Sequence, residues 1–241
     1  MKNTENIRNK IERLPKGYAF TYSDFLFDIE YKEAVIKALN RMVVAGSIRK
    51  ISKGRFYKPE ITIFGELKPS IREIVKDLLI KDGKVTGYIT GYSIYNELGL
   101  TTQLSSTIQI GRNEVRSSLK RDIYTISFIK QKNKITKDKI SLLQILDSIR
   151  FIKKIPDVSI TQSCSRLVKL LEVFPKERII EAIKLSMKYP PYSRALLGAI
   201  LDESNSDVDT ASLQASLNFI SIYKIPEATK ALKYSRKWNL L

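Results

Sequence analysis

The sequence predicts an α+β fold that is mostly helical. Apolar residues recur every three to four positions through long stretches, above all after residue 139, as in amphipathic helices. Between residues 83 and 111, five glycines separate shorter runs typical of strands. With 241 residues, 43% of them hydrophobic, the chain can bury a real core in one large or two smaller domains.

The first 26 residues predict a helix, a short strand and a second helix. Ile7, Ile11 and Leu14 form the apolar stripe of the first helix, and Pro15 follows the stripe. We expect a strand at residues 18–20. Next, Thr21 has the spacing of a helix cap to which Asp24 bonds back, so a short helix should run to residue 26.

A longer helix is predicted from residue 32 to residue 45. The segment KEAVIKALNRMVVAG contains no proline and ends in Gly46, which suits the left-handed position after a helix. Its apolar side chains are at helical spacing: Val35, Ala38, Leu39 and Met42. On the opposite face, Lys37, Asn40 and Arg41 should project together.

The next segment, IRKISKGRFYKP at residues 48–59, predicts a strongly basic hairpin. Gly54 allows its tight turn, and Lys53 and Arg55 flank that glycine. Residues 32–58 hold eight Lys or Arg side chains against one acid, Glu33. Helix, strand, short helix, longer helix and hairpin form the order of a winged helix-turn-helix, which we place at residues 1–60.

This arrangement predicts binding to double-stranded DNA, with the longer helix in the major groove and the hairpin as the wing beside the phosphates. The net charge of +17 favours a polyanionic partner as well. The alternative is a winged module that contacts only protein. The predicted DNA-binding residues are Lys32, Lys37, Asn40, Arg41, Arg49, Lys50, Lys53 and Arg55.

A second domain is predicted at residues 66–241, after the linker ITIFGELKPS. Residues 66–139 should mix strands and helices, with strands at 85–89, 107–110 and 123–129 and helices at 70–80 and 92–98. Residues 140–241 should be helical, with prolines at the helix boundaries.

Composition also excludes several kinds of chemistry. Without histidine, and with Cys164 as the one cysteine, the chain can build neither a Ser-His-Asp site nor a thiolate zinc site. We expect no enzymatic activity, no cofactor, no metal and no catalytic residue. Glu66, Leu67 and Lys68 match half of a metal-dependent nuclease signature, so a carboxylate nuclease stays as a lesser alternative. No signal peptide or membrane span is recognisable, and we expect a cytoplasmic protein.

Four segments resemble AbiEi-type antitoxins, the regulatory halves of bacterial toxin-antitoxin pairs that act in phage defence by abortive infection. These segments are LPKGYAFTYSDF, KEAVIKALNRMVVAGSIRKISKGRFYKP, GYITGYSIYNELGLTTQ and PPYSRALLGAIL, within residues 5 to about 200. The resemblance implies a winged domain that represses its own promoter and an antitoxin-like domain that counters a nucleotidyltransferase-like toxin. It implies no role for the last 40 or so residues.

Overall fold

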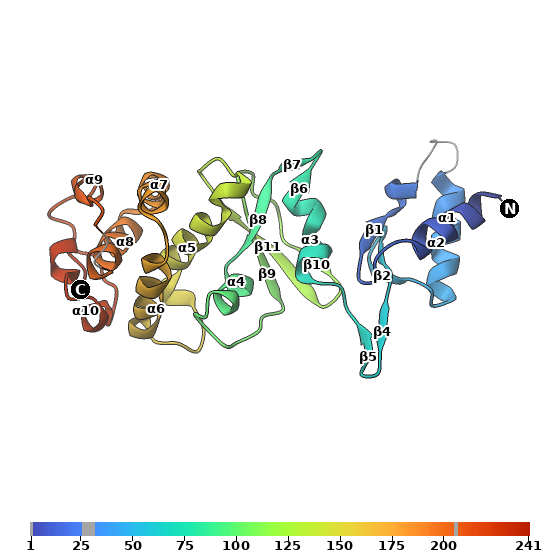
Figure 1. The fold of residues 1–241 in the computed structure, drawn as a ribbon, viewed down its shortest axis with the longest axis horizontal. Helices are drawn as coiled ribbons and strands as arrows, with labels where there is room; N and C mark the ends of the chain where they lie inside the picture. Colours follow the sequence, from blue (N-terminus) through green and yellow to red (C-terminus); the bar gives the residue numbers. More distant parts are fainter. Residues whose placement is uncertain (1, 26–31, 205–206) are drawn as a thin grey trace. The chain divides into compact units, whose positions relative to one another are not determined.

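The structure, a computed structural model, describes residues 2–25, 32–204 and 207–241 (Figure 1). It is a mixed α+β protein, and this part of the predicted fold class is confirmed. The chain forms two compact units. The first comprises Met1–Asp77 and Leu119–Thr125, and the second comprises Leu78–Ser118 and Ile126–Leu241. Within the described ranges, no helix combines the length and apolar character that crossing a membrane requires.

The first unit begins with the helices and strands that the sequence predicts. In chain order they are α1 (Lys2–Glu12), β1 (Ala19–Thr21), the 3-10 helix η1 (Tyr22–Phe25), α2 (Lys32–Val44), β2 (Arg49–Ser52) and β3 (Arg55–Tyr57). The Thr21 amide donates to the Asp24 carboxylate at 2.7 Å, as the capping pattern predicts. The predicted end of this short helix at residue 26, and the turn before α2, lie outside the described residues.

Helix α2 ends where its glycine requires it to end. Gly46 has a φ of 76°, and its amide donates to the Val43 carbonyl at 3.0 Å. One side of α2 is buried at Val35, Ala38, Leu39 and Met42. These side chains pack into a core that also includes Ile7, Ile11, Phe20, Phe25, Ile48 and Phe56. The predicted apolar faces of α1 and α2 therefore form the core of this unit.

Strands β1, β3 and β2 form a three-stranded antiparallel sheet in that order. Strands β2 and β3 form the basic hairpin, whose tip contains Gly54 at a φ of 72°. A side chain there would be strained, so the sequence places glycine at this turn. The hairpin that the sequence predicts at residues 48–59 is confirmed.

The segment after residue 60, which the sequence predicts as a linker, contains secondary structure. It contains a second hairpin, in which β4 (Glu60–Thr62) pairs with β5 (Gly65–Leu67). All three residues of β5 are exposed, so no apolar-polar alternation marked it as a strand. Helix α3 (Ile71–Leu79) follows, as predicted. Strand β10 (Leu119–Arg121) comes much later in the sequence but belongs to the first unit.

The second unit contains a sheet and a group of helices, and its three predicted strands are confirmed. They are β8 (Gly87–Thr90), β9 (Thr107–Arg112) and β11 (Tyr124–Lys130), in the sheet order β11-β9-β8. The short strands β6 (Ile80–Lys81) and β7 (Lys84–Val85) pair with each other. The predicted helix near residue 92 is α4 (Tyr92–Glu97).

From residue 137 the chain is helical. Its elements are η3 (Lys137–Lys139), α5 (Ile140–Arg150), η4 (Ile152–Lys154), α6 (Ile160–Glu172), α7 (Lys176–Ser186), α8 (Pro191–Glu203), α9 (Ala211–Ala215), α10 (Ala228–Ala231) and η5 (Ser235–Trp238). Helix α8 is buried without interruption from Ala195 to Leu201 and lies among the other helices (Figure 1). Trp238, 1% exposed, packs its ring against Gly198 of α8. The last residues of the chain therefore complete this helical core.

Candidate nucleic-acid interface

The exposed face of α2 presents three polar side chains within about one helical turn of one another. Lys37, Asn40 and Arg41 are all exposed, opposite the buried stripe of the same helix. Lys37 and Arg41 form no ion pair with any other residue that the structure describes. Val44, 90% exposed, extends the same face by another turn. Two cations, an amide and a methyl-bearing side chain therefore project from one side of α2.

Lys32, at the first residue of α2, is placed differently. Its ammonium nitrogen lies 5.4 Å from the centre of the Tyr22 ring. That cation-π contact directs the side chain toward the short helix η1 and still leaves the residue exposed.

At the hairpin, Lys50 and Lys53 are exposed, and neither is ion-paired within the described ranges. Lys53 immediately precedes Gly54, at whose position a Cβ would lie 3.5 Å from the Tyr22 ring. The turn thus passes close to Tyr22, the residue whose ring also contacts Lys32. Lys32, Tyr22 and the hairpin tip therefore lie near one another.

Arg49, also predicted to bind DNA, is ion-paired. Its Nε and Nη2 atoms each lie 2.9 Å from the Glu66 carboxylate of β5, and its Nη1 donates to the Gly46 carbonyl at 2.6 Å. The Tyr57 hydroxyl donates to the other Glu66 oxygen at 2.8 Å, and burial with this bond raises the pKa of Tyr57 to about 12. Arg49 therefore fixes the second hairpin against the first.

Arg55 is ion-paired as well. Its guanidinium lies 2.6 Å from the Asp77 carboxylate, which also accepts two bonds from Arg121, at 2.6 and 2.9 Å. The Arg121 side chain is only 5% exposed and also donates to the Ile74 carbonyl at 2.6 Å. Burial opposes ionisation of Asp77, but its bonds to Arg121 and the charge of Arg55 outweigh burial and lower its pKa.

The sequence reasoning missed the carboxylates that hold these arginines. Glu66 is 17 residues from Arg49, Asp77 is 22 residues from Arg55, and Arg121 is 44 residues beyond Asp77. Lys58, the last cation of the basic segment, likewise donates to the carbonyls of Glu12, the last residue of α1, and of Leu14, which follows that helix. No local signal predicts pairing over such distances. Among the eight cations of residues 32–58, all of which the structure describes, five are exposed: Lys32, Lys37, Arg41, Lys50 and Lys53.

Glu66 and Lys68, the residues of the nuclease half-signature, are both engaged in ion pairs. Glu66 is engaged by Arg49 and Tyr57, and Lys68 pairs with Asp122 at 2.7 Å. Among the described residues, no group of three or more His, Cys, Asp or Glu side chains is placed to hold a metal ion. The residues around Glu66 therefore fit a structural ion pair better than a hydrolytic site.

Two tyrosines and the cysteine are buried in the core. Tyr88 and Tyr95 are 2% and 1% exposed, so they cannot offer rings for stacking on bases. Cys164 is fully buried, and burial raises the pKa of its thiol to about 12. It is an inert apolar side chain, as expected for a buried cysteine.

Comparison with known proteins gives a fold relative and a family. No curated protein matches the chain. The crystal structure of the RV2827C protein from Mycobacterium tuberculosis matches with a TM-score of 0.59 and 12% identity, over 95% of this chain and 86% of that one. At this identity the likeness concerns the fold alone. A family profile described as "Family of unknown function (DUF6088)" matches residues 6–200, and the chain therefore belongs to the DUF6088 family.

Proposed function

We propose that this protein is a cytoplasmic antitoxin that binds its own promoter and represses its operon, and that its second unit counters a nucleotidyltransferase-like toxin. In this proposal α1, η1, α2 and the β2–β3 hairpin are a winged helix-turn-helix with α2 as the recognition helix. The protein has no enzymatic role and needs no cofactor. The antitoxin half of the proposal rests on the resemblance of the four sequence segments to AbiEi-type proteins.

One observation carries the DNA-binding half: the cluster of exposed cations on α2 and the β2–β3 hairpin. Lys37 and Arg41 on α2 and Lys50 and Lys53 on the hairpin have no carboxylate partner in the described part of the chain. Phosphates would supply the negative partners that these side chains lack within the described residues. Asn40 and Arg41 have the donors and acceptors that read adenine and guanine edges in the major groove.

The ion pairs assign a different task to two of the predicted contact residues. Arg49 and Arg55 hold the hairpin through Glu66 and Asp77, so we propose that they orient the wing. Phosphate contacts would then come from Lys37, Lys50 and Lys53, with Lys32 close by. A module that contacts only protein is the alternative, and it does not require this group of unpaired cations.

The salt dependence of binding tests the DNA-binding half directly. Fluorescence anisotropy with the duplex upstream of the gene should give a log Kd that rises with log salt by about 3 to 4 per bound copy, at ~0.9 per neutralised phosphate. The matched control is Lys169→Gln, an exposed lysine of α6 in the second unit, which should leave the slope unchanged. A slope near zero would contradict DNA binding and favour the module that contacts only protein.

A further inference from the structure

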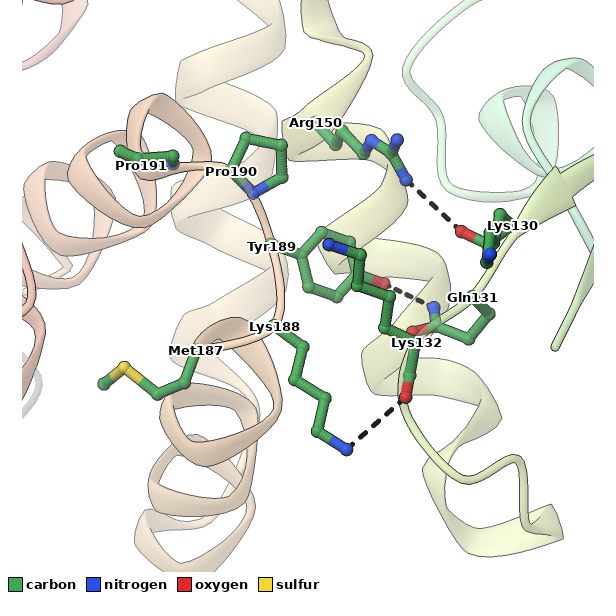
Figure 2. Close-up of a pocket in the computed structure, with 9 residues that line it drawn as sticks. All are labelled: Lys130, Gln131, Lys132, Arg150, Met187, Lys188, Tyr189, Pro190 and Pro191. Atoms are coloured by element: carbon green, nitrogen blue, oxygen red, sulfur yellow. Dashed lines mark hydrogen bonds between the residues drawn. The ribbon is translucent and has the colours of Figure 1, made fainter.

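The second unit contains a basic pocket that the proposed function does not use (Figure 2). Its volume is about 490 Å³, within the range of small-molecule sites. Lys130, Lys132, Arg150 and Lys188 line it, and no carboxylate does. Met187, Tyr189, Pro190 and Pro191 supply its apolar walls. Four positive charges thus surround one concave space.

These cations come from separate parts of the fold. Lys130 ends β11 and Lys132 follows it, Arg150 ends α5, and Lys188 lies between α7 and α8. None of the four forms an ion pair with another residue in the described ranges. Arg150 lies 4.9 Å from the centre of the Phe151 ring, a contact that holds the guanidinium without neutralising it.

The internal bonds of these cations are weak. Arg150 donates to the Lys130 carbonyl at 3.5 Å and Lys188 to the Lys132 carbonyl at 3.4 Å, both longer than usual hydrogen bonds (Figure 2). Basic residues also favour the carboxyl ends of helices, and α5 and α7 both end here. Yet these two side chains bond to carbonyls of the last residue of β11 and of the segment that follows it, and not to those of their own helices. An anion would bind them more strongly than these neutral carbonyls.

The floor of the pocket is rigid. Gln131 is 4% exposed and donates to the hydroxyls of Tyr88 and Tyr189, each at 2.8 Å. Tyr88 and Tyr189 in turn donate to the fully buried Asp147 at 2.6 and 2.9 Å. The side chain of Asn113 holds the Gln131 carbonyl at 2.7 Å.

Asp147 does not line the pocket, but it accepts a hydrogen bond from the hydroxyl of the lining residue Tyr189. Burial raises the pKa of Asp147, while its hydroxyl donors Tyr88, Tyr189 and Thr90 act in the opposite direction. Its oxygens are thus occupied by donors from within the core, and the cations remain for a ligand in the pocket. The segment that carries Lys130 and Lys132 is therefore fixed before any ligand binds.

From this geometry we infer that the pocket binds a small molecule bearing a di- or triphosphate group. The charge of such a group matches four cations better than a single carboxylate would. The pocket is concave, whereas the backbone of a nucleic acid follows a longer open groove. Proline and tyrosine walls can cover the non-ionic part of the ligand. This inference is independent of promoter binding.

Isothermal titration of the full chain with tripolyphosphate and, separately, with ATP tests the inference. We expect saturable binding of one equivalent, and about tenfold weaker affinity for Lys132→Gln and for Lys188→Gln, since each loses one charge-assisted bond. Lys169→Gln serves as the matched control because Lys169 is exposed on α6, outside the pocket. Thermal unfolding should show that all three variants fold alike.

Three results would overturn the inference. The first is that neither polyphosphate binds saturably. The second is that Lys169→Gln loses as much polyphosphate affinity as the pocket variants. The third is that a 12-nucleotide single strand binds in a way that depends on Lys132 while tripolyphosphate does not bind. The last result would mean that the pocket is a nucleic-acid contact. Because duplex promoter DNA should bind Lys132→Gln with unchanged affinity, a failure of this inference is distinguishable from a failure of the proposed DNA binding.

Discussion

Arg41 and Lys53 are both exposed cations, but their positions predict different effects on DNA binding. Arg41 lies on the face of α2 beside Asn40, where a guanidinium can bond a guanine edge in the major groove. Lys53 lies at the hairpin tip, where in the proposed complex its ammonium would contact phosphate. Under the proposed function, sequence discrimination should therefore come from the helix and general affinity from the hairpin.

Arg41→Ala should cost ~1–3 kcal/mol on the promoter duplex and clearly less on a random duplex of the same length. Lys53→Ala should weaken both duplexes by the same factor, because a phosphate contact does not depend on sequence. Anisotropy titrations at one fixed salt concentration compare the four pairs. If Arg41→Ala lost equal affinity on both duplexes, α2 would not read bases.

The contact between Gly198 and Trp238 predicts a stability effect at one residue. A Cβ at position 198 would lie 2.3 Å from the Trp238 ring, so Gly198→Ala must displace that ring from a packed core. We expect a loss of ~1–3 kcal/mol in urea unfolding, although alanine favours helix more than glycine does.

The double variant Gly198→Ala/Trp238→Leu provides the control, since leucine leaves room for the added methyl group. In that background the further cost of Gly198→Ala should shrink or change sign. Equal costs in both backgrounds would show that the ring does not press on α8.

At the level of elements, Asp77 joins the β2–β3 hairpin, through Arg55, to Arg121 at the end of β10. The pKa of Asp77 is lowered in the folded chain. Its ion pairs therefore stabilise the fold at pH values above 3.8, the pKa of this carboxyl in the unfolded chain. That contribution is lost as the pH falls below about 4 and the carboxylate takes up a proton.

Asp77→Asn should therefore destabilise the first unit at pH 7 and make the loss of stability below about pH 4 smaller than in the wild type. The cost should be ~1–3 kcal/mol, because Arg121 is left buried with a weaker partner and Asp77 is itself partly exposed. Urea unfolding at several pH values measures both effects. The control Asp82→Asn, at an exposed turn without an ion pair in the described ranges, should change neither.

Elements with a local sequence pattern could be predicted, whereas those positioned by contacts between distant residues could not. Helix α2 and the β2–β3 hairpin carry local signals, an apolar stripe ended by Gly46 and a turn at Gly54, and both were predicted within a residue or two. Strand β5 exposes all its residues and has no such signal. Its position depends on Glu66 meeting Arg49 and Tyr57, a contact between segments that periodicity cannot show.

The same limit applies to the candidate site. The sequence identified which residues are cations, and their spacing placed Lys37 and Arg41 correctly on one exposed face. It could not show which cations are ion-paired, because Glu66 and Asp77 lie 17 and 22 residues away from their arginines. The structure therefore separates Arg49 and Arg55 from the exposed cations, and that difference determines which substitutions are informative.

For the whole molecule, the proposal requires two separable activities. Promoter binding would depend on cations of the first unit, whereas neutralising a toxin requires a larger shaped surface, which the helical second unit can supply. A fragment that ends near residue 62 cannot test this separation. It lacks Glu66 and Asp77, and therefore loses the ion pairs that these residues form with Arg49 and Arg55. Point variants of the full chain avoid that loss.

The double variant Arg41→Ala/Lys53→Ala should lose repression of a promoter reporter but still restore growth to cells that express the neighbouring toxin gene. Both side chains are exposed and unpaired among the described residues, so their truncation should leave the fold intact, which circular dichroism checks. The control Lys169→Gln should keep both activities. If the folded double variant represses poorly and also fails to restore growth, the first unit must itself act against the toxin, and the proposed division of labour is wrong.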